Sequence, residues 1–250
     1  MIEIDSLSYW YSRRRKVLEN LSIQLNMFPL VVLGPNGAGK STLLSLIAGA
    51  ERPKAGTVSL DRRRRNPRRS IRHLRRLTGW LPQDVRPLAG FSCSEQISYA
   101  AWLKGMSTRA AGTAALDAMD LVGLGAFRDR PAGQLSGGER RRLGIAQAIV
   151  HGPDYLILDE PHAGLDPEQR ASVQDTLVRL SSKMNVVVST HQTDNFQASY
   201  AQVMVMNHGS VLFHGSADAF LDVARRLDAN GGGAEEAYSS IIRGEGRSRS

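Results

Sequence analysis

The fold of this chain is decided by the stretch Gly34-Pro35-Asn36-Gly37-Ala38-Gly39-Lys40-Ser41-Thr42. This stretch fits the pattern G-x-x-x-x-G-K-[ST], in which a glycine-rich loop joins a strand to a helix and wraps around nucleotide phosphates. The apolar run at residues 30–33 is typical of a buried strand, and leucines at helical spacing follow the loop as far as Gly49. We therefore predict that backbone N–H groups and a helix N-terminus bind a nucleoside triphosphate here. Lys40 is expected on its β- and γ-phosphates and Ser41 on Mg²⁺.

The composition predicts a globular chain that folds by itself. With 250 residues, 42% of them hydrophobic, the chain forms one large or two small domains. No stretch approaches the roughly 18 to 20 apolar residues of a membrane helix, and the first residues do not resemble a basic-then-apolar leader. We therefore expect a chain that neither spans a membrane nor is secreted. Cys93 is the single cysteine, which excludes internal disulfides and fits a reducing compartment.

Much of the net charge of +8 comes from one arginine-rich run, Arg62–Arg76. Three interpretations are open. The run is a solvated linker or surface, or it contacts anionic lipid headgroups beneath a membrane partner, or it binds nucleic acid. Because no aromatic residues are interleaved with the arginines to stack on bases, we expect no nucleic-acid partner.

The hydrophobic pattern predicts that strands and helices alternate along the chain. Two antiparallel strands are expected at the N-terminus around a turn at residues 12–16, and the pattern is helical from 84 to 150. This alternation predicts a largely parallel sheet with helices on its faces and an inserted helical block. The glycine-rich, charged residues 226–250 are expected to be largely disordered. Further strands are predicted at 57–60, 155–158, 186–189, 203–206 and 211–213, and helices at 94–103, 110–119 and 139–150.

Two carboxylates, Asp159 and Glu160, directly follow the apolar run Tyr155–Leu158. In open α/β sheets, ligands bind at the carboxyl ends of the strands, so this pair is expected at the phosphate site. Asp159 suits Mg²⁺ ligation, either directly or through water. Glu160 is then placed to polarise the attacking water as a general base.

A third segment identifies a family: Gln134-Leu135-Ser136-Gly137-Gly138-Glu139-Arg140-Arg141-Arg142. Locally, Ser136 and Glu139 form the S-x-x-E capping box of a helix. Leu-Ser-Gly-Gly ahead of a basic helix, shortly before the strand that ends in Asp159 and Glu160, resembles the signature of ATP-binding cassette (ABC) ATPases. The resemblance extends to about residue 225. It implies an α/β P-loop NTPase (RecA-like) core with an N-terminal antiparallel β subdomain and an α-helical subdomain inserted at about residues 84–150.

The resemblance also assigns roles at the nucleotide. Tyr11 lies where the family's aromatic residue stacks on adenine, although Tyr9 and Trp10 are neighbours that could take this role. Gln83 looks like the loop glutamine that contacts Mg²⁺ or the attacking water. His191, at the end of a predicted strand, is similar to the histidine that contacts the γ-phosphate and orients the water.

A second subunit is implied as well. In the family, Ser136, Gly137 and Gly138 face the γ-phosphate held by the opposite subunit, and Asp166 resembles the key acid of the loop through which the two sites communicate. A homodimer that closes on ATP and opens after hydrolysis is the simplest arrangement. The expected catalytic residues are Lys40, Gln83, Glu160 and His191, the expected Mg²⁺ ligands are Ser41, Gln83 and Asp159, and the expected cofactors are ATP and Mg²⁺.

Within the family, the helix Arg140–Ala148 and the segment Ala101–Gly105 look like the branch that serves ABC-2 type exporters of drugs, antibiotics or peptides. In that branch the ATPase is a separate chain that docks on a transmembrane permease subunit. We therefore expect a peripheral location on the cytoplasmic side of the cell membrane. An importer ATPase and a soluble cassette ATPase of the iron–sulfur assembly type are the alternatives.

One departure from the family pattern lies beside the expected catalytic residues. His162 stands where a threonine is common, directly after Glu160-Pro161. Because an unperturbed histidine changes charge near neutral pH, His162 is expected to add pH sensitivity to hydrolysis.

Overall fold

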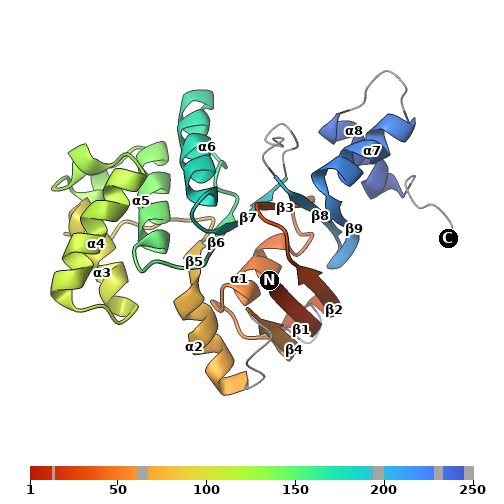
Figure 1. Ribbon diagram of the computed structural model, residues 1–250, viewed down its shortest axis with the longest axis horizontal. Coiled ribbons are helices and arrows are strands. Elements are labelled where there is room, and N and C mark those ends of the chain that lie inside the picture. The colour runs from red at the N-terminus through yellow and green to blue at the C-terminus, as the bar shows by residue number, and fades with distance from the viewer. Residues whose placement is uncertain (13–14, 61–66, 192, 194–199, 228–232, 245–250) are drawn as a thin grey trace. The chain divides into compact units, whose positions relative to one another are not determined.

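The computed structural model describes residues 1–12, 15–60, 67–191, 193, 200–227 and 233–244 (Figure 1). The chain forms two compact units, residues 1–71 with 187–250 and residues 72–186. Buried apolar side chains occur in both units. None of the helices in the described ranges is long and apolar enough to cross a membrane.

The first unit begins with a three-stranded antiparallel sheet. Its strands are β1 (Ile2–Ser12), β2 (Arg15–Leu25) and β4 (Ala55–Ser59), in the order β2-β1-β4. Ile2 pairs with Leu25 at one end, and both side chains are fully buried. Alternating apolar residues place one face of this sheet in the core. The predicted pair of antiparallel N-terminal strands is therefore confirmed.

The same unit contains the strand that leads to the phosphate loop. This strand, β3 (Leu30–Leu33), pairs in parallel with β7 (Asn185–Thr190) on one edge and β8 (Gln202–Asn207) on the other. Strand β9 (Ser210–Ser216) continues the sheet antiparallel to β8. All four residues of β3 are at most 1% exposed, which explains why the strand is continuously apolar. Helix α1 (Lys40–Ile47) follows the loop.

Two helices close the first unit and correct one prediction. Helix α7 spans Ala217–Leu227, and helix α8 spans Ala234–Arg243. Only α8 lies wholly within residues 226–250, the region expected to be largely disordered. Helix α8 packs on α7, β8 and β9, and it buries Ala237 and Ile241. The expectation of disorder is wrong for α8, because flanking glycines and charges dominate the composition and mask a short amphipathic segment. Residues 228–232 and 245–250 lie outside the described residues.

The second unit is mainly helical. Three of its helices, α3 (Cys93–Leu103), α4 (Thr108–Leu121) and α5 (Gly137–Ile149), pack on one another (Figure 1). Helix α6 (Pro167–Ser181) follows later, and two single 3₁₀ turns cover Gly125–Phe127 and Ala132–Gln134. Each long helix begins with a side chain that accepts a backbone hydrogen bond: Ser92, Ser107, Ser136 and Asp166.

Two parallel strands complete the second unit. Strand β5 (Thr78–Leu81) pairs with β6 (Tyr155–Asp159), which is buried along its whole length. The sequence analysis predicted β6 but not β5, whose residues include a polar threonine and a glycine. Asn185 N–H, at the start of β7, donates a hydrogen bond of 3.0 Å to the backbone oxygen of Asp154, directly before β6.

Part of the arginine-rich run forms a helix that was not predicted. Helix α2 (Pro67–Leu77) carries apolar residues at 71, 74 and 77, and Leu74 is only 2% exposed. These positions recur every three residues, so they lie along one side of the helix. Residues 62–66, which include the first four arginines of the run, lie outside the described residues. Contact of the run with anionic lipid stays a prediction.

The close approach of β5 to α5 can be tested at Gly79. A Cβ atom on Gly79 would lie 2.3 Å from the backbone oxygen of Ala148, so the strand or the helix would have to shift. We expect Gly79→Ala to lower the free energy of unfolding by about 1–3 kcal/mol in urea titrations. In Gly112→Ala, the control on α4, no atom other than the neighbouring residues and backbone of α4 itself lies within 4 Å of the added Cβ, and stability should rise by about 0.5–1 kcal/mol. Equal stability of Gly79→Ala and the parent chain would contradict this packing.

Candidate functional site

The backbone of the phosphate loop adopts conformations that require glycine. Gly37 and Gly39 have φ of 84° and 99°, in the left-handed region that side chains disfavour. A Cβ on Gly34 would lie 2.4 Å from the backbone oxygen of Met206, so only glycine fits where the loop leaves β3. Gly39 is the N-cap of α1 and offers no side chain to the first turn. The backbone N–H groups of that turn can therefore receive an anion.

Lys40 lies against the same loop. It is 5% exposed, and its Nζ donates to the backbone oxygens of Gly34 at 2.6 Å and Pro35 at 3.2 Å. The loop thus holds an ammonium group at the start of α1. A cation held there can neutralise phosphate oxygens through charge-assisted hydrogen bonds. Ser41, the next residue, is exposed.

The expected adenine-stacking residue, Tyr11, is accessible at the end of β1. Its side chain is 59% exposed, and its hydroxyl lies 3.1 Å from Thr42 Oγ1, next to the phosphate loop. Tyr9 is only 4% exposed and its hydroxyl bonds to Glu51, so its ring is not available for stacking. Of the two tyrosines, exposure thus favours Tyr11.

His191 leaves the sheet at the same edge as the phosphate loop. In the parallel ladder of β3 and β7, Leu33 pairs with Thr190. The residues that follow this pair are Gly34 and His191, and His191 is exposed. The first unit therefore brings together Tyr11, the phosphate loop and His191.

In the second unit, the end of β6 carries the two predicted carboxylates. Asp159 is 3% exposed and Glu160 is 7% exposed. Glu160 has a φ of 48°, a left-handed conformation that costs a residue with a side chain on the order of 1–3 kcal/mol. Strained conformations of this kind are concentrated at functional sites. Because Leu81 pairs with Leu158, the loop that carries Gln83 leaves the sheet at the same edge as Glu160.

The predicted capping box at the start of α5 is confirmed. Ser136 N–H donates to Glu139 Oε2 at 2.7 Å, and Glu139 N–H donates to Ser136 Oγ at 3.3 Å. The bond from the Ser136 backbone lowers the pKa of Glu139, with help from nearby Arg130 and Arg142. Ser136 and Gly137 are exposed, so this helix N-terminus is open to an anion.

Asp166 has a structural task in addition to its predicted role. Its Oδ1 accepts a hydrogen bond of 2.8 Å from Gln169 N–H, which caps α6, and Pro167 occupies the first turn. The Gln169 side chain lies 2.9 Å from the position of a Cβ on Gly138. The loop of Asp166 therefore lies beside the glycines at the start of α5.

The donor atoms suit Mg²⁺. Ser41, Gln83 and Asp159 offer a hydroxyl, an amide and a carboxylate oxygen, the donor type that Mg²⁺ prefers. Within the described part of the chain, no group of three or more His, Cys, Asp or Glu side chains could hold a metal ion. Mg²⁺ does not need such a group, because it commonly binds one or two protein oxygens together with substrate phosphates and water.

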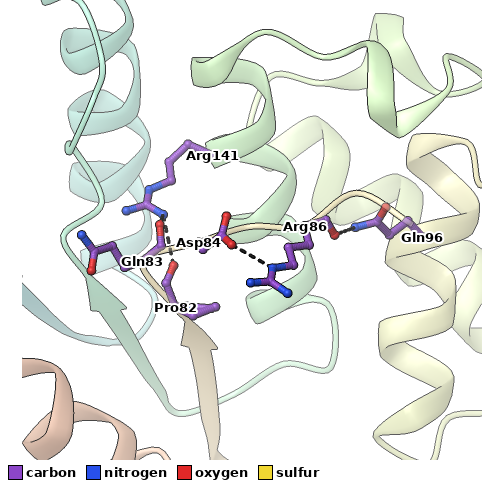
Figure 2. A network of polar contacts seen from close by, with 6 residues as sticks. All are labelled: Pro82, Gln83, Asp84, Arg86, Gln96 and Arg141. Atoms are coloured by element: carbon purple, nitrogen blue, oxygen red, sulfur yellow. Dashed lines mark hydrogen bonds and ion pairs between the residues drawn. The ribbon is translucent and has the colours of Figure 1, made fainter. Parts of the chain in front are cut away.

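Sequence analysis missed one residue of this region, Arg141. It is the middle of three consecutive arginines on α5, so composition does not distinguish it from Arg140 and Arg142. Arg141 is 6% exposed, and its guanidinium bonds to backbone oxygens just after β5 and at the end of β6. Figure 2 shows its bonds to the carbonyls of Pro82 and Gln83, in the loop after β5. No sequence signal could have identified it, because those acceptors are distant in the chain.

A glycine-rich phosphate loop on a buried parallel strand, with a second strand that ends in two carboxylates, defines a P-loop nucleoside triphosphatase. The chain matches the ABC transporter family over residues 18–163. It belongs to that family, as an ATP-binding subunit.

Curated relatives agree with this family. The chain is 36% identical to the uncharacterized ABC transporter ATP-binding protein YxlF of Bacillus subtilis, over 86% of this chain and 70% of that protein. It is 34% identical to the cobalt import ATP-binding protein CbiO of Rhodobacter capsulatus, over 93% of this chain and 84% of that protein. It is also 34% identical to the Nod factor export ATP-binding protein I of Burkholderia orbicola, over 76% and 62%. A relative named for import and one named for export thus share the same identity with this chain, 34%.

Solved structures give the same fold. An ATP-binding subunit of an ABC transporter matches with a TM-score of 0.79 at 23% identity, over 97% of this chain and 99% of that one. The cbiO1 protein of Clostridium perfringens, part of the ABC transporter complex cbiONQ, matches with a TM-score of 0.75 at 27% identity, over 92% and 96%. The dimeric cassette MJ0796 bound to ADP and Pi matches with a TM-score of 0.74 at 23% identity, over 86% and 98%. The predicted P-loop NTPase fold is therefore confirmed.

The environment of His162 contradicts its expected role. The side chain is 4% exposed, and burial lowers its pKa from the ordinary 6.5 to about 4, with further lowering by Arg170 and Arg141. The side chain of Gln174 only partly opposes this shift. His162 is therefore neutral near neutral pH, and the expected pH sensitivity of hydrolysis in that range is wrong.

The same pKa predicts an effect on stability instead. Because the folded pKa lies below the unfolded one, the unfolded chain binds more protons, and stability falls as the pH drops from about 6.5 to about 4. Relative to His162→Gln, the parent chain should lose about 2 kcal/mol of unfolding free energy between pH 7.5 and pH 5 in urea titrations. The pH profile of hydrolysis between 6.5 and 9 should keep its shape. An identical loss of unfolding free energy in the parent chain and in His162→Gln would rule out His162 as the cause of the pH-dependent stability.

Proposed function

We propose that this ATPase hydrolyses ATP with Glu160 as the general base that polarises the attacking water. Lys40 and the N-terminus of α1 bind the β- and γ-phosphates, and His191 contacts the γ-phosphate and orients the water. Tyr11 stacks on the adenine. Since phosphoryl transfer demands little covalent chemistry from a protein, the rate depends on alignment and charge neutralisation.

The observation that carries this proposal is the position of Glu160. It follows a fully buried strand, it is itself nearly buried, and its backbone is held at a φ of 48°. A carboxylate that only capped a loop would not need a left-handed conformation. This backbone conformation sets the direction in which the Glu160 side chain leaves the end of the strand, and a positioned carboxylate can accept a proton from water.

The side-chain oxygens of Ser41, Asp159 and Gln83 would hold Mg²⁺. When bound, Mg²⁺ neutralises charge on the β- and γ-phosphate oxygens. Ser41 lies directly after the phosphate-binding Lys40, and Asp159 lies directly before the proposed base. These two ligands therefore sit next to residues that act on the γ-phosphate or on water.

We further propose a homodimer in which each chain completes its partner's site. The capped N-terminus of α5 at Ser136, Gly137 and Gly138, of which Ser136 and Gly137 are exposed, suits the γ-phosphate held by the second subunit. Asp166 lies beside these glycines and serves communication between the two sites. The dimeric MJ0796 cassette supports this arrangement. A complete set of catalytic residues in one chain makes two identical sites the simplest solution.

For transport, we propose export by a separate transmembrane permease subunit, with the ATPase peripheral on the cytoplasmic side of the membrane. An ATPase that works as one chain of a larger complex is supported by the relative cbiO1, which is part of the ABC transporter complex cbiONQ. The direction rests on the resemblance of Arg140–Ala148 and Ala101–Gly105 to the ABC-2 exporter branch, since a relative named for import and one named for export have the same identity to this chain.

The base assignment predicts a selective defect in Glu160→Gln. ATP affinity should stay within about threefold, because the amide keeps the shape of the side chain. Turnover should fall by a factor of about 10² or more, since general bases contribute roughly 10²–10⁴. The variant should also accumulate as an ATP-bound dimer in size-exclusion chromatography.

The matched control is Glu168→Gln, an exposed glutamate in the first turn of α6. Its turnover should equal that of the parent chain. Hydrolysis by Glu160→Gln at a near-normal rate would refute Glu160 as the base, whatever the oligomeric state.

Export can be tested without knowing the substrate. Cells that carry Glu160→Gln in place of the parent chain should accumulate a compound that the parent strain releases into its medium. Mass spectrometry of cell extracts and media would detect this difference. A compound that remains in the medium of the variant, but is depleted by the parent strain, would instead establish import.

A further inference from the structure

The guanidinium group of Arg141 is buried on α5 and uses its whole donor capacity on backbone oxygens. Nε donates at 2.9 Å, Nη1 donates at 3.1 and 2.7 Å, and Nη2 donates to two further oxygens, one of them at 3.0 Å. A guanidinium carries five N–H groups, and here all five have an acceptor. The acceptor of Nε is the carbonyl of Pro161. The acceptors of Nη1 are the carbonyls of Pro82 and Gln83, and those of Nη2 are the carbonyls of Asp159 and Glu160.

The charge of Arg141 strengthens these bonds. Burial lowers the pKa of Arg141, but the nearby carboxylates of Asp159, Glu160 and Asp84 oppose that shift. A guanidinium stays protonated in proteins, so each bond is charge-assisted. A lysine ammonium has three donors at one point and could not reach acceptors spread around a planar fork.

The acceptors belong to two segments that both carry catalytic residues. One segment leaves β6 with Glu160, and the other leaves β5 with Gln83. The second is a loop without regular secondary structure at residues 82–88, and Gln83 in it is exposed. Loops of this kind have few contacts of their own to hold a side chain in one place.

A second anchor holds the far part of this loop. Gln96 of α3 is 1% exposed, and its side chain bonds to Arg86 O at 3.3 Å and to Leu88 N–H at 2.8 Å. In Figure 2, Arg141 reaches the carbonyls of Pro82 and Gln83, while Gln96 reaches that of Arg86. The loop is therefore tied at its beginning to α5 and further along to α3.

Helix α5 is also shaped to receive the loop. Gly144 lies three residues after Arg141, on the same side of the helix. A Cβ on Gly144 would lie 2.5 Å from Leu81 Cδ1 and 2.6 Å from Val85 Cγ2. The missing side chain lets β5 and the loop approach α5 closely enough for Arg141 to reach the carbonyls.

We propose that Arg141 is a positioning residue for ATP hydrolysis: it fixes the backbone of Gln83 and of Glu160 to α5, the helix that Ser136 caps. This inference rests on the proposed function, in which Glu160 polarises the water and Gln83 contacts the water or Mg²⁺. The neighbouring arginines make other contacts. Arg140 bonds to Leu135 O at 3.3 Å, and Arg142 lies 3.5 Å from Ser172 Oγ.

The first test compares turnover with nucleotide binding. Arg141→Gln should lower kcat at least tenfold and Arg141→Lys at least threefold, while the Kd for ATP stays within twofold. Arg142→Gln, which removes the same charge from the same helix, should stay within twofold in both. If Arg141→Gln does not fold, Arg141→Lys carries the test, because it keeps the charge. A folded variant with kcat within twofold of the parent chain would overturn the inference.

The second test separates positioning from a general effect on folding. In a Gln83→Ala background, Arg141→Lys should reduce kcat by a smaller factor than in the parent background, because part of what Arg141 positions is already absent. Equal factors in the two backgrounds would mean that Arg141 does not act through Gln83, and would overturn that part of the inference.

Hydrogen exchange without nucleotide distinguishes this inference from the proposed function. Amides of residues 82–88 should exchange faster in Arg141→Lys than in the parent chain and in Arg142→Gln. Unchanged exchange would overturn the role of Arg141 as an anchor, even if Glu160 is the base. If Arg141→Lys exchanges faster but has a normal kcat, the positioning role is overturned. If Glu160→Gln also has normal turnover, the failure lies in the proposed function, because Glu160 is then not the base.

Discussion

The register of parallel strands is the constraint on which this site depends. Leu33 pairs with Thr190 in one unit, and Leu81 pairs with Leu158 in the other. Parallel strands end at the same edge, so each pair delivers two loops side by side. The phosphate loop thereby lies next to His191, and the loop of Gln83 lies next to Glu160. The strands carry no chemistry themselves, and their buried apolar side chains set where the polar ends emerge.

Strand ends create a second requirement, because backbone carbonyls that leave a ladder need new partners. At the end of β3, Lys40 supplies hydrogen bonds to the loop oxygens of Gly34 and Pro35. At the ends of β5 and β6, Arg141 supplies five. In both places a buried cation holds a loop in shape, but only Lys40 is proposed to reach the substrate.

Sequence reasoning succeeded where the signal was local. The phosphate loop, the apolar strands and the capping box of Ser136 and Glu139 each lie within about ten residues, and the structure contains all three elements. It failed where a local signal was weak or hidden. Arginines masked the apolar side of α2, glycines masked α8, and β5 is short and partly polar. Helix α6 was missed although Asp166-Pro167 is a recognised helix start.

By itself, the sequence determined the family and the ATPase activity, because these depend on short patterns with fixed spacing. Tertiary structure alone decided that Tyr11 and not Tyr9 exposes its ring, that His162 is buried and neutral, and that Glu160 has a left-handed backbone. It also singled out Arg141 from its neighbours. Burial and hydrogen bonding arise from segments that meet only after folding, so no local pattern could have carried this information.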